Sequence, residues 1–216
     1  MEGGDVSVGT LRFSARETRD LVVAWLALGV AFAVFFAGGG SGFLATVQEG
    51  GGATIFVVSL LTAGVAFLLH ELAHKVVAVR FGQVAEFRAD YGMLFLAVMS
   101  AMIGFLFAAP GAVHHRGMLT KREHGLIALA GPVTNLVLGA VCVPIIVAGA
   151  AVGSGLVAQI GQWGLGINLL LAAFNMIPYG PLDGRTVLGW SKLVWALVFF
   201  PSAALAFVAL FVVGLF

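Results

Sequence analysis

Long apolar stretches separated by short polar or glycine-rich segments dominate the hydropathy pattern of this 216-residue chain. Several of them are long enough to cross a bilayer as helices, which takes about 20 apolar residues at about 1.5 Å rise per residue. The repeated period-two alternation that a membrane β-barrel requires does not occur in the sequence. The pattern therefore predicts an all-α bundle, with spanning helices at about 15–37, 53–81, 123–149, 157–177 and 190–216.

Polar residues and glycines predict where the regular elements begin and end. Ser14 and Glu17, in "SARE", have the spacing of a capping box and predict the start of the first helix. Gly82 is a natural residue to follow the end of the second helix. The segments 6–14 and 84–90 ("VAEFRAD") alternate between apolar and polar residues. They predict short strands at the membrane face, beside an otherwise helical bundle.

The composition indicates the class of protein to which this pattern belongs. Hydrophobic residues make up 61% of the chain and charged residues 10%, with a mean hydropathy of +1.08. Soluble domains carry about 25% charged residues, so the chain is expected to form one integral membrane domain over residues 1–216, with the lipid bilayer as its surroundings. Its basic residues form no cluster, which excludes a nucleic-acid partner. The single cysteine, Cys142, excludes a disulfide framework and a thiolate zinc site.

The stretch "FLLHELAHKVVAVRFG", residues 67–82, places polar side chains inside a predicted spanning helix. His70 and His74 are four residues apart, so they project from one helix face and are suitably spaced to bind one zinc ion. Glu71 completes an H-E-x-x-H pattern, in which the glutamate acts as general base. A buried polar trio that only stabilises helix packing is the alternative. Such groups cost about 2.5 to 3.5 kcal/mol each in a spanning helix, which favours the functional interpretation.

A hydrolytic zinc site usually has three protein ligands and an open position, so the histidine pair lacks one ligand. Asp183, in "NMIPYGPLDGRT", is the only acidic residue after Glu123. Pro178 and Pro181 end the preceding helix, and the neighbouring glycines permit a tight turn that directs the carboxylate inward. We therefore predict that Asp183 is the third ligand of one zinc ion per chain. An ordinary interfacial turn is the alternative.

Two weaker candidates remain. Asn135 lies inside an apolar helix, at the end of "GPVTN". Its amide could donate to a developing oxyanion or hold a substrate backbone, or it could form an interhelical hydrogen bond. A polar loop between residues 110 and 124 contains further groups that could bind a metal, although a solvated loop is the more common role for such residues. These groups are His114, His115, Glu123 and His124.

Taken in order and in their membrane setting, "HELAH", "GPVTN" and "NMIPYGPLDG" resemble the site-2 protease family of zinc intramembrane metalloproteases. The resemblance extends from about residue 53 to 190. Its specific part is the pairing of H-E-x-x-H with L-D-G. It implies a core of three spans that carries the metal, with strand-like elements that help to present the substrate, and it strengthens the assignment of Asp183.

The resemblance implies an endopeptidase that cleaves membrane proteins within or near their transmembrane segments, with Glu71 as the base. A helical peptide bond is shielded, so the substrate must unwind locally, and an edge strand can supply replacement hydrogen bonds. The segment 84–90 is the candidate edge, so Phe87 and Arg88 are expected to bind substrate. Asn135, in "GPVTN", is the third expected substrate-binding residue. The competing class is a non-catalytic metal-binding membrane protein, either a transporter or an inactive homologue. Polar residues gathered at one level of the bundle favour the enzyme.

Charge bias predicts the topology of the chain. Three arginines before residue 20 place the N-terminus in the cytoplasm, and the segment 38–52, which has no lysine or arginine, lies outside. The second helix then returns, with His74 near the cytoplasmic face of the cell membrane. If the apolar run 91–109 crossed completely, Asp183 would arrive about 30 Å away on the opposite face. We therefore predict that 91–109 is re-entrant and that the active site lies toward the cytoplasm.

Overall fold

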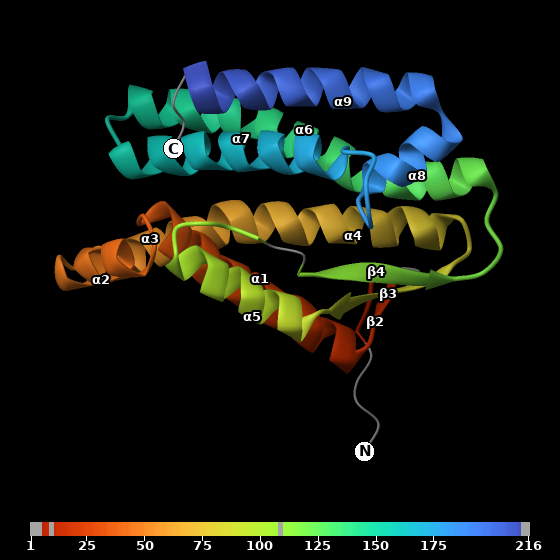
Figure 1. Cartoon of the computed structure of the whole chain (residues 1–216), viewed down its shortest axis with the longest axis horizontal. Coiled ribbons are helices and arrows are strands. Elements are labelled where there is room, and N and C mark those ends of the chain that lie inside the picture. Colours follow the sequence, from red (N-terminus) through yellow and green to blue (C-terminus); the bar gives the residue numbers. More distant parts are fainter. Residues whose placement is uncertain (1–5, 9–10, 108–109, 213–216) are drawn as a thin grey trace. The chain divides into compact units, whose positions relative to one another are not determined.

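The computed structural model describes residues 6–8, 11–107 and 110–212, and helices dominate this part of the chain (Figure 1). Among the described residues, five helices are long and apolar enough to cross a membrane. This confirms the predicted all-α membrane fold with a small β-element. The five are α1 (Ala15–Phe36), a continuous helix of α3 (Gly52–Ser59), η1 (Leu60–Gly64) and α4 (Val65–Arg80), then α6 (Lys121–Ala151), α7 (Gly155–Asn175) and α9 (Lys192–Phe207) with η2 (Val208–Val212).

Side-chain caps fix where several of these helices begin. Ser14 Oγ accepts a hydrogen bond from the N–H of Glu17 at 3.2 Å, which confirms the predicted start of α1. Thr120 and Glu123 form a complete capping box at the start of α6. Gly82 follows α4 with a φ of +75°, a conformation that favours glycine, as predicted for this helix end.

Contacts group the chain into two units, and the sequence passes between them within α4. Unit 1 comprises Met1–Leu68 and Gln83–Arg116, and unit 2 comprises Leu69–Gly82 and Gly117–Phe216. The H-E-x-x-H segment and Asp183 therefore belong to the same unit. The segment 84–90 belongs to the other.

Unit 1 contains the short strands and the helices α1, α2, α3 and α5. Strand β1 (Val6–Val8) pairs with β2 (Leu11–Phe13), and β3 (Val84–Ala89) pairs with β4 (Gly111–Arg116), both antiparallel. The strands predicted in 6–14 and 84–90 are thus present. The sequence had placed 111–116 in a polar loop, but this segment forms a strand because its backbone pairs with β3.

The apolar run 91–109 returns to the place where it starts. It opens as α5 (Tyr91–Met102), whose 12 residues extend about 18 Å, well short of a hydrocarbon core of about 30 Å. The N–H of Asp90 donates to the carbonyl of Pro110 at 3.0 Å, so the two ends of the run lie side by side. This geometry agrees with the predicted re-entrant course, which stays a prediction. Helix α5 lies beside α1, as Figure 1 shows.

The glycine-rich segment 38–52, for which the hydropathy pattern predicts no helix, contains α2 (Gly40–Gln48). Gly39 precedes this helix with a φ of +94°, a backbone conformation that a residue with a side chain rarely adopts. The turn at Gly39 redirects the chain, and the apolar stretch "FLATV" after the glycines then forms the helix.

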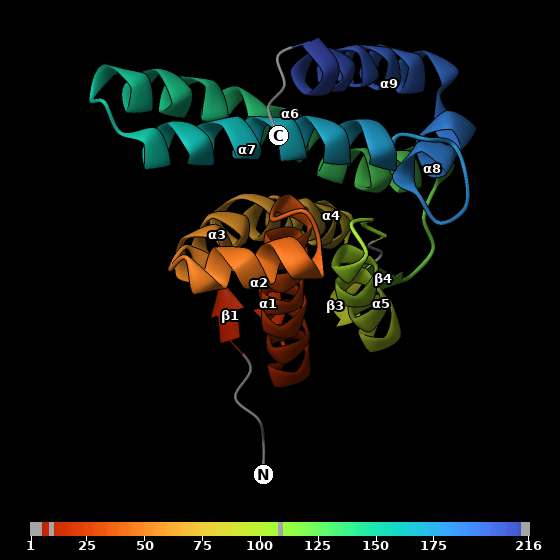
Figure 2. The same cartoon turned by 60° about the vertical axis from the view of Figure 1, so that its left-hand side comes forward.

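Unit 2 is built on α6 and α7, which run side by side with α9 beside them (Figures 1 and 2). Small residues let α6 and α7 approach closely: a Cβ added at Gly149 would lie 2.4 Å from the backbone of Ala158. After α7, a turn leads into α8 (Asp183–Trp190). The indole of Trp195 on α9 donates to the carbonyl of Met176 at 2.8 Å and fixes the end of α7.

Candidate metal centre

The two histidines of H-E-x-x-H lie on one face of α4, and each has one ring nitrogen held by α6. His70 Nδ1 lies 2.6 Å from Asn135 Oδ1, and His74 Nδ1 lies 2.7 Å from the carbonyl oxygen of Ile127. Because both partners are acceptors, each Nδ1 carries the proton and each Nε2 keeps its lone pair. The two Nε2 atoms lie 3.0 Å apart. Both imidazoles are therefore set in the tautomer that binds a metal through Nε2.

Asp183 reaches this pair through the turn between α7 and α8. Gly180 has a φ of +59°, and a Cβ added at Gly184 would lie 2.0 Å from the carbonyl oxygen of Met176. Both positions therefore require glycine, one for its conformation and one for close backbone approach. The turn places Asp183 at the first position of α8, with its carboxylate beside the imidazoles.

The three ligand atoms form a triangle of the size that zinc requires. Asp183 Oδ2 lies 3.3 Å from His70 Nε2 and 3.4 Å from His74 Nε2, and the third edge is the 3.0 Å between the imidazoles. Tetrahedral ligands at about 2.0–2.1 Å from zinc lie about 3.3–3.4 Å apart. Asp183 Oδ2 is buried and has no hydrogen-bond partner, as expected of an atom that binds a cation. The residues fit zinc.

The charge state of Asp183 suits this role. Burial alone would raise the pKa of its carboxyl group. The two imidazoles beside the carboxylate outweigh burial and lower the pKa to about 2. Asp183 is therefore ionised at neutral pH, as a ligand of a divalent cation must be.

Gly131 of α6 lies directly against the ligand atoms. A Cβ added there would be 2.5 Å from Nε2 of both His70 and His74. Only glycine leaves room at this position, so α6 forms one wall of the centre with its backbone. The glycine of "GPVTN" thus has a steric role that the sequence alone did not indicate.

Asn135 forms interhelical hydrogen bonds, which is one of the alternatives left open by the sequence, and its expected role toward a substrate is untested. It is fully buried, its Oδ1 faces His70, and its Nδ2 donates to Asn168 Oδ1 at 2.9 Å. Asn168, on α7, was not singled out from the sequence. Its only signal was an amide side chain inside an apolar helix, at a position where most neighbours are aliphatic.

Glu71 follows His70 on α4 and is 8% exposed. Of the other candidate ligands whose side chains the structure describes, namely His114, Glu123 and His124, none joins the centre, and the side chain of His115 lies outside the described part. Glu123 is occupied by the capping box with Thr120. Among the side chains that the structure describes, only His70, His74 and Asp183 form a group able to hold a metal ion.

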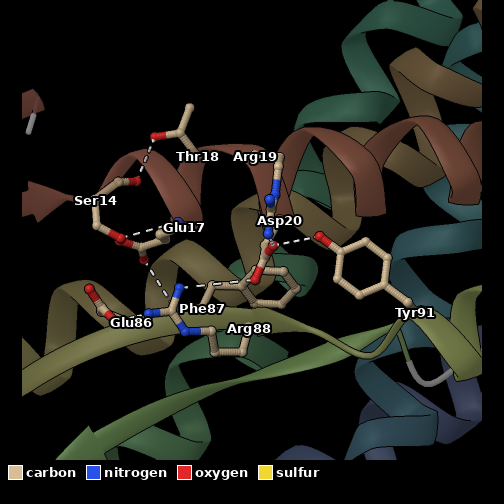
Figure 3. A network of polar contacts seen from close by, with 9 residues as sticks. All are labelled: Ser14, Glu17, Thr18, Arg19, Asp20, Glu86, Phe87, Arg88 and Tyr91. Atoms are coloured by element: carbon tan, nitrogen blue, oxygen red, sulfur yellow. Dashed lines mark hydrogen bonds and ion pairs between the residues drawn. The ribbon is translucent and has the colours of Figure 1, made fainter. Parts of the chain in front are cut away.

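Phe87 and Arg88 lie in unit 1, where they belong to a polar and aromatic network (Figure 3). The Phe87 ring is 1% exposed and packs against Phe67, with ring centroids 5.8 Å apart. Its backbone N–H donates to Glu17 Oε1 at 2.9 Å. Arg88 forms ion pairs with Asp20 and Glu86. The expectation that both side chains bind substrate is untested, and in this structure both are engaged within the protein.

Curated proteins provide an independent comparison for the chain. A predicted zinc metalloprotease of Methanocaldococcus jannaschii, MJ0611, is 39% identical over 192 residues, which cover 88% of this chain and 92% of the relative. The predicted zinc metalloprotease YwhC of Bacillus subtilis is 31% identical over 148 residues, covering 60% of this chain and 66% of the relative.

A third relative is longer than this chain. The predicted zinc metalloprotease Rip3 of Mycobacterium tuberculosis is 35% identical over 150 residues, which cover 65% of this chain but 34% of Rip3. No family model and no solved structure matches the chain. The metalloprotease names agree with the chemistry of the histidine and aspartate cluster.

Proposed function

Because this chain belongs to the site-2 protease family of zinc metalloproteases, we propose that it is an intramembrane endopeptidase that cleaves membrane proteins within or near a transmembrane segment. The single observation that carries the proposal is the triangle formed by His70, His74 and Asp183. Its edges of 3.0, 3.3 and 3.4 Å match one zinc ion, and its carboxylate oxygen lacks any other partner.

The three ligands would hold zinc and leave one position open toward the substrate. When bound, zinc polarises the scissile carbonyl and makes water more acidic. Glu71 would accept a proton from the attacking water and deliver it to the nitrogen of the leaving amine as the peptide bond breaks. Asn135 and Ile127 would keep the imidazoles oriented during this cycle.

The position of the ligands supports a substrate inside the membrane. His74 lies six residues before the end of an apolar helix of 29 residues, Gly52–Arg80. Six residues correspond to about 9 Å, so the centre lies below the surface of the bilayer but near one face. We propose that this is the cytoplasmic face. Lysines and arginines near the ends of spanning helices favour the cytoplasm, and the basic residues of this chain flank the spans on the side of His74.

A substrate that unwinds near zinc needs new partners for its backbone, and a strand edge can provide them. The outer edge of β3 is already occupied. Glu17 accepts from the N–H of Phe87, and the Asp20 carboxylate interacts with the backbone of Ala89. Both carboxylates come from one face of α1, as Figure 3 shows. Strand addition at β3 would have to displace them.

The outer edge of β4 is a better candidate. Phe87 pairs with Val113, and the N–H of Phe87 points away from β4 toward Glu17. In antiparallel pairs, facing residues are either both bonded to each other or both directed outward. The N–H and carbonyl of Val113 are therefore directed outward, and no hydrogen bond joins them to another described residue. We propose that a substrate strand pairs with β4.

Reconstitution tests the proposed activity. The purified protein in nanodiscs is expected to contain zinc and to cleave a model peptide with one transmembrane segment. A chelator should stop cleavage, and added zinc should restore it. Bound zinc with no cleavage of any spanning peptide would instead support a non-catalytic metal-binding protein. Absence of bound metal after zinc loading would contradict both.

A further inference from the structure

We infer that Asn168 is a positioning residue for the metal centre, which it controls from α7 without touching a ligand. The inference rests on the proposed zinc site. Asn168 is 4% exposed, and its Oδ1 accepts from Asn135, whose Oδ1 lies 2.6 Å from His70 Nδ1. These hydrogen bonds form a relay from Asn168 through Asn135 to His70. The relay starts on α7, crosses α6 and ends on a ligand carried by α4.

The backbone of α7 sets the direction of every bond in this relay. Asn168 lies 2.8 Å from the carbonyl oxygen of Gly164, and a carbonyl only accepts. Asn168 must therefore turn its NH₂ group toward Gly164 and its oxygen toward Asn135. Asn135 must in turn present its NH₂ to Asn168 and its oxygen to His70.

The consequence for His70 is a single tautomer. Facing an amide oxygen, its Nδ1 must carry the proton, which leaves the Nε2 lone pair available for the metal. If Asn135 turned over, its NH₂ group would face Nδ1 and favour the opposite tautomer, with the proton on Nε2. Asn168 opposes that rotation, because its oxygen holds the NH₂ group of Asn135.

His74 reaches the same state by a simpler route, since its Nδ1 faces the backbone carbonyl of Ile127 directly. A backbone carbonyl cannot turn over. Of the two imidazoles, His70 is the one held by a side-chain amide among the described residues, so a substitution on another helix can change its orientation. Partners of this kind typically affect metal affinity by 10–100-fold.

The test is a double-mutant cycle on zinc affinity, measured in the full-length protein by competition with a chelator of known affinity. Asn168→Leu is expected to weaken zinc binding by about 10-fold. Asn135→Leu is expected to weaken it at least as much. In the Asn135→Leu background, Asn168→Leu should have no further effect, because both act through His70.

Leu169→Ala is the matched control. Leu169 is 7% exposed on the same helix and packs against α6 and α9 without joining the relay. It should lower the thermal midpoint and leave zinc affinity unchanged. Asn168→Ala is measured in parallel in case leucine disturbs packing.

Wild-type zinc affinity in a folded Asn168 variant, or additive effects in the cycle, would overturn the relay. Both outcomes would leave the proposed protease function intact. Failure of the wild-type protein to bind zinc would instead contradict the proposed function itself.

Discussion

At the residue scale, the centre depends on side chains that each have one defined task. The imidazoles are oriented by acceptors on α6, and the carboxylate of Asp183 is delivered by a turn that tolerates only glycine at two positions. These tasks lead to separate predictions, one for the removal of a ligand and one for a side chain that occupies the position of the metal.

Removal of the carboxylate should abolish the third coordination bond. We expect Asp183→Ala to lower zinc affinity by about 100-fold or more, since changes to residues behind the ligands already cost 10–100-fold. Asp183→Asn should retain part of the affinity, because an amide oxygen is a weaker ligand of similar shape. Chelator competition measures both. Wild-type affinity in Asp183→Ala would show that another group completes the site.

Gly131→Ala should exclude the metal by steric hindrance. The new methyl group would lie 2.5 Å from Nε2 of both histidines, where zinc has to bind. The matched control is Gly139→Ala on the same helix, where a Cβ would meet its nearest neighbours at an ordinary 3.6–3.7 Å. Zinc content per folded chain is the measurement. Equal zinc content in the two variants would refute the assigned position of the metal.

The sequence identified residues whose chemistry is unusual for their setting. His70, Glu71, His74 and Asp183 are ionisable groups in or beside apolar helices. The free-energy cost of placing such groups in a membrane indicated that they have a function. The partners of Asn135 could not be predicted in the same way. Amide side chains serve many roles, and only the packing of α6 against α4 and α7 decides which acceptor each amide meets.

At the scale of elements, the paired strands show how a helix can determine which strand edge is available. Glu17 was expected from the sequence as a capping residue, yet its carboxylate also holds the outer edge of β3. Strand β4 itself was missed, because "GAVHHR" has little strand character and is ordered by pairing with β3. Strand identity here is a tertiary effect.

Proline scanning of β4 tests the proposed pairing edge. Val113→Pro removes an outward N–H and leaves the bonds to β3 intact, so cleavage of a membrane substrate should fall by about 10-fold while zinc binding is unchanged. Val113→Ala keeps the N–H and should remain active. His114→Pro removes an inward N–H and should destabilise the strand pair as well. Full activity in Val113→Pro would exclude β4 as the pairing edge.

At the scale of the whole molecule, the order of spans along the chain could be predicted because apolar length is a strong signal. The re-entrant course of 91–109 was predicted from charge bias and the need to bring Asp183 to the histidines. The hydrogen bond between Asp90 and Pro110 supports it. Helix α2 was missed, because glycines flank a segment too short to be recognised by its hydropathy.

Cysteine labelling tests the predicted topology. Val84 and Met118 flank the re-entrant part of the chain and are 71% and 100% exposed. Cysteines at these positions, in a Cys142→Ala background, should react with a membrane-impermeant maleimide from the same side, and a cysteine at Leu44 of α2 should react from the other. Gly111, at the start of β4, is unsuitable for an introduced cysteine, since a Cβ there would lie 2.3 Å from the carbonyl oxygen of Arg88. Labelling of 84 and 118 from opposite sides would contradict the topology.

The central claim is that this chain hydrolyses peptide bonds within membrane segments, with Glu71 as the proton carrier. The most direct measurement is mass spectrometry of the products formed from a spanning peptide by the zinc-loaded wild type and by Glu71→Gln. The wild type is expected to cut within or next to the spanning segment, and Glu71→Gln is expected to bind the same amount of zinc but to form no product. Equal product from both proteins, or cleavage confined to bonds far from the membrane, would contradict it.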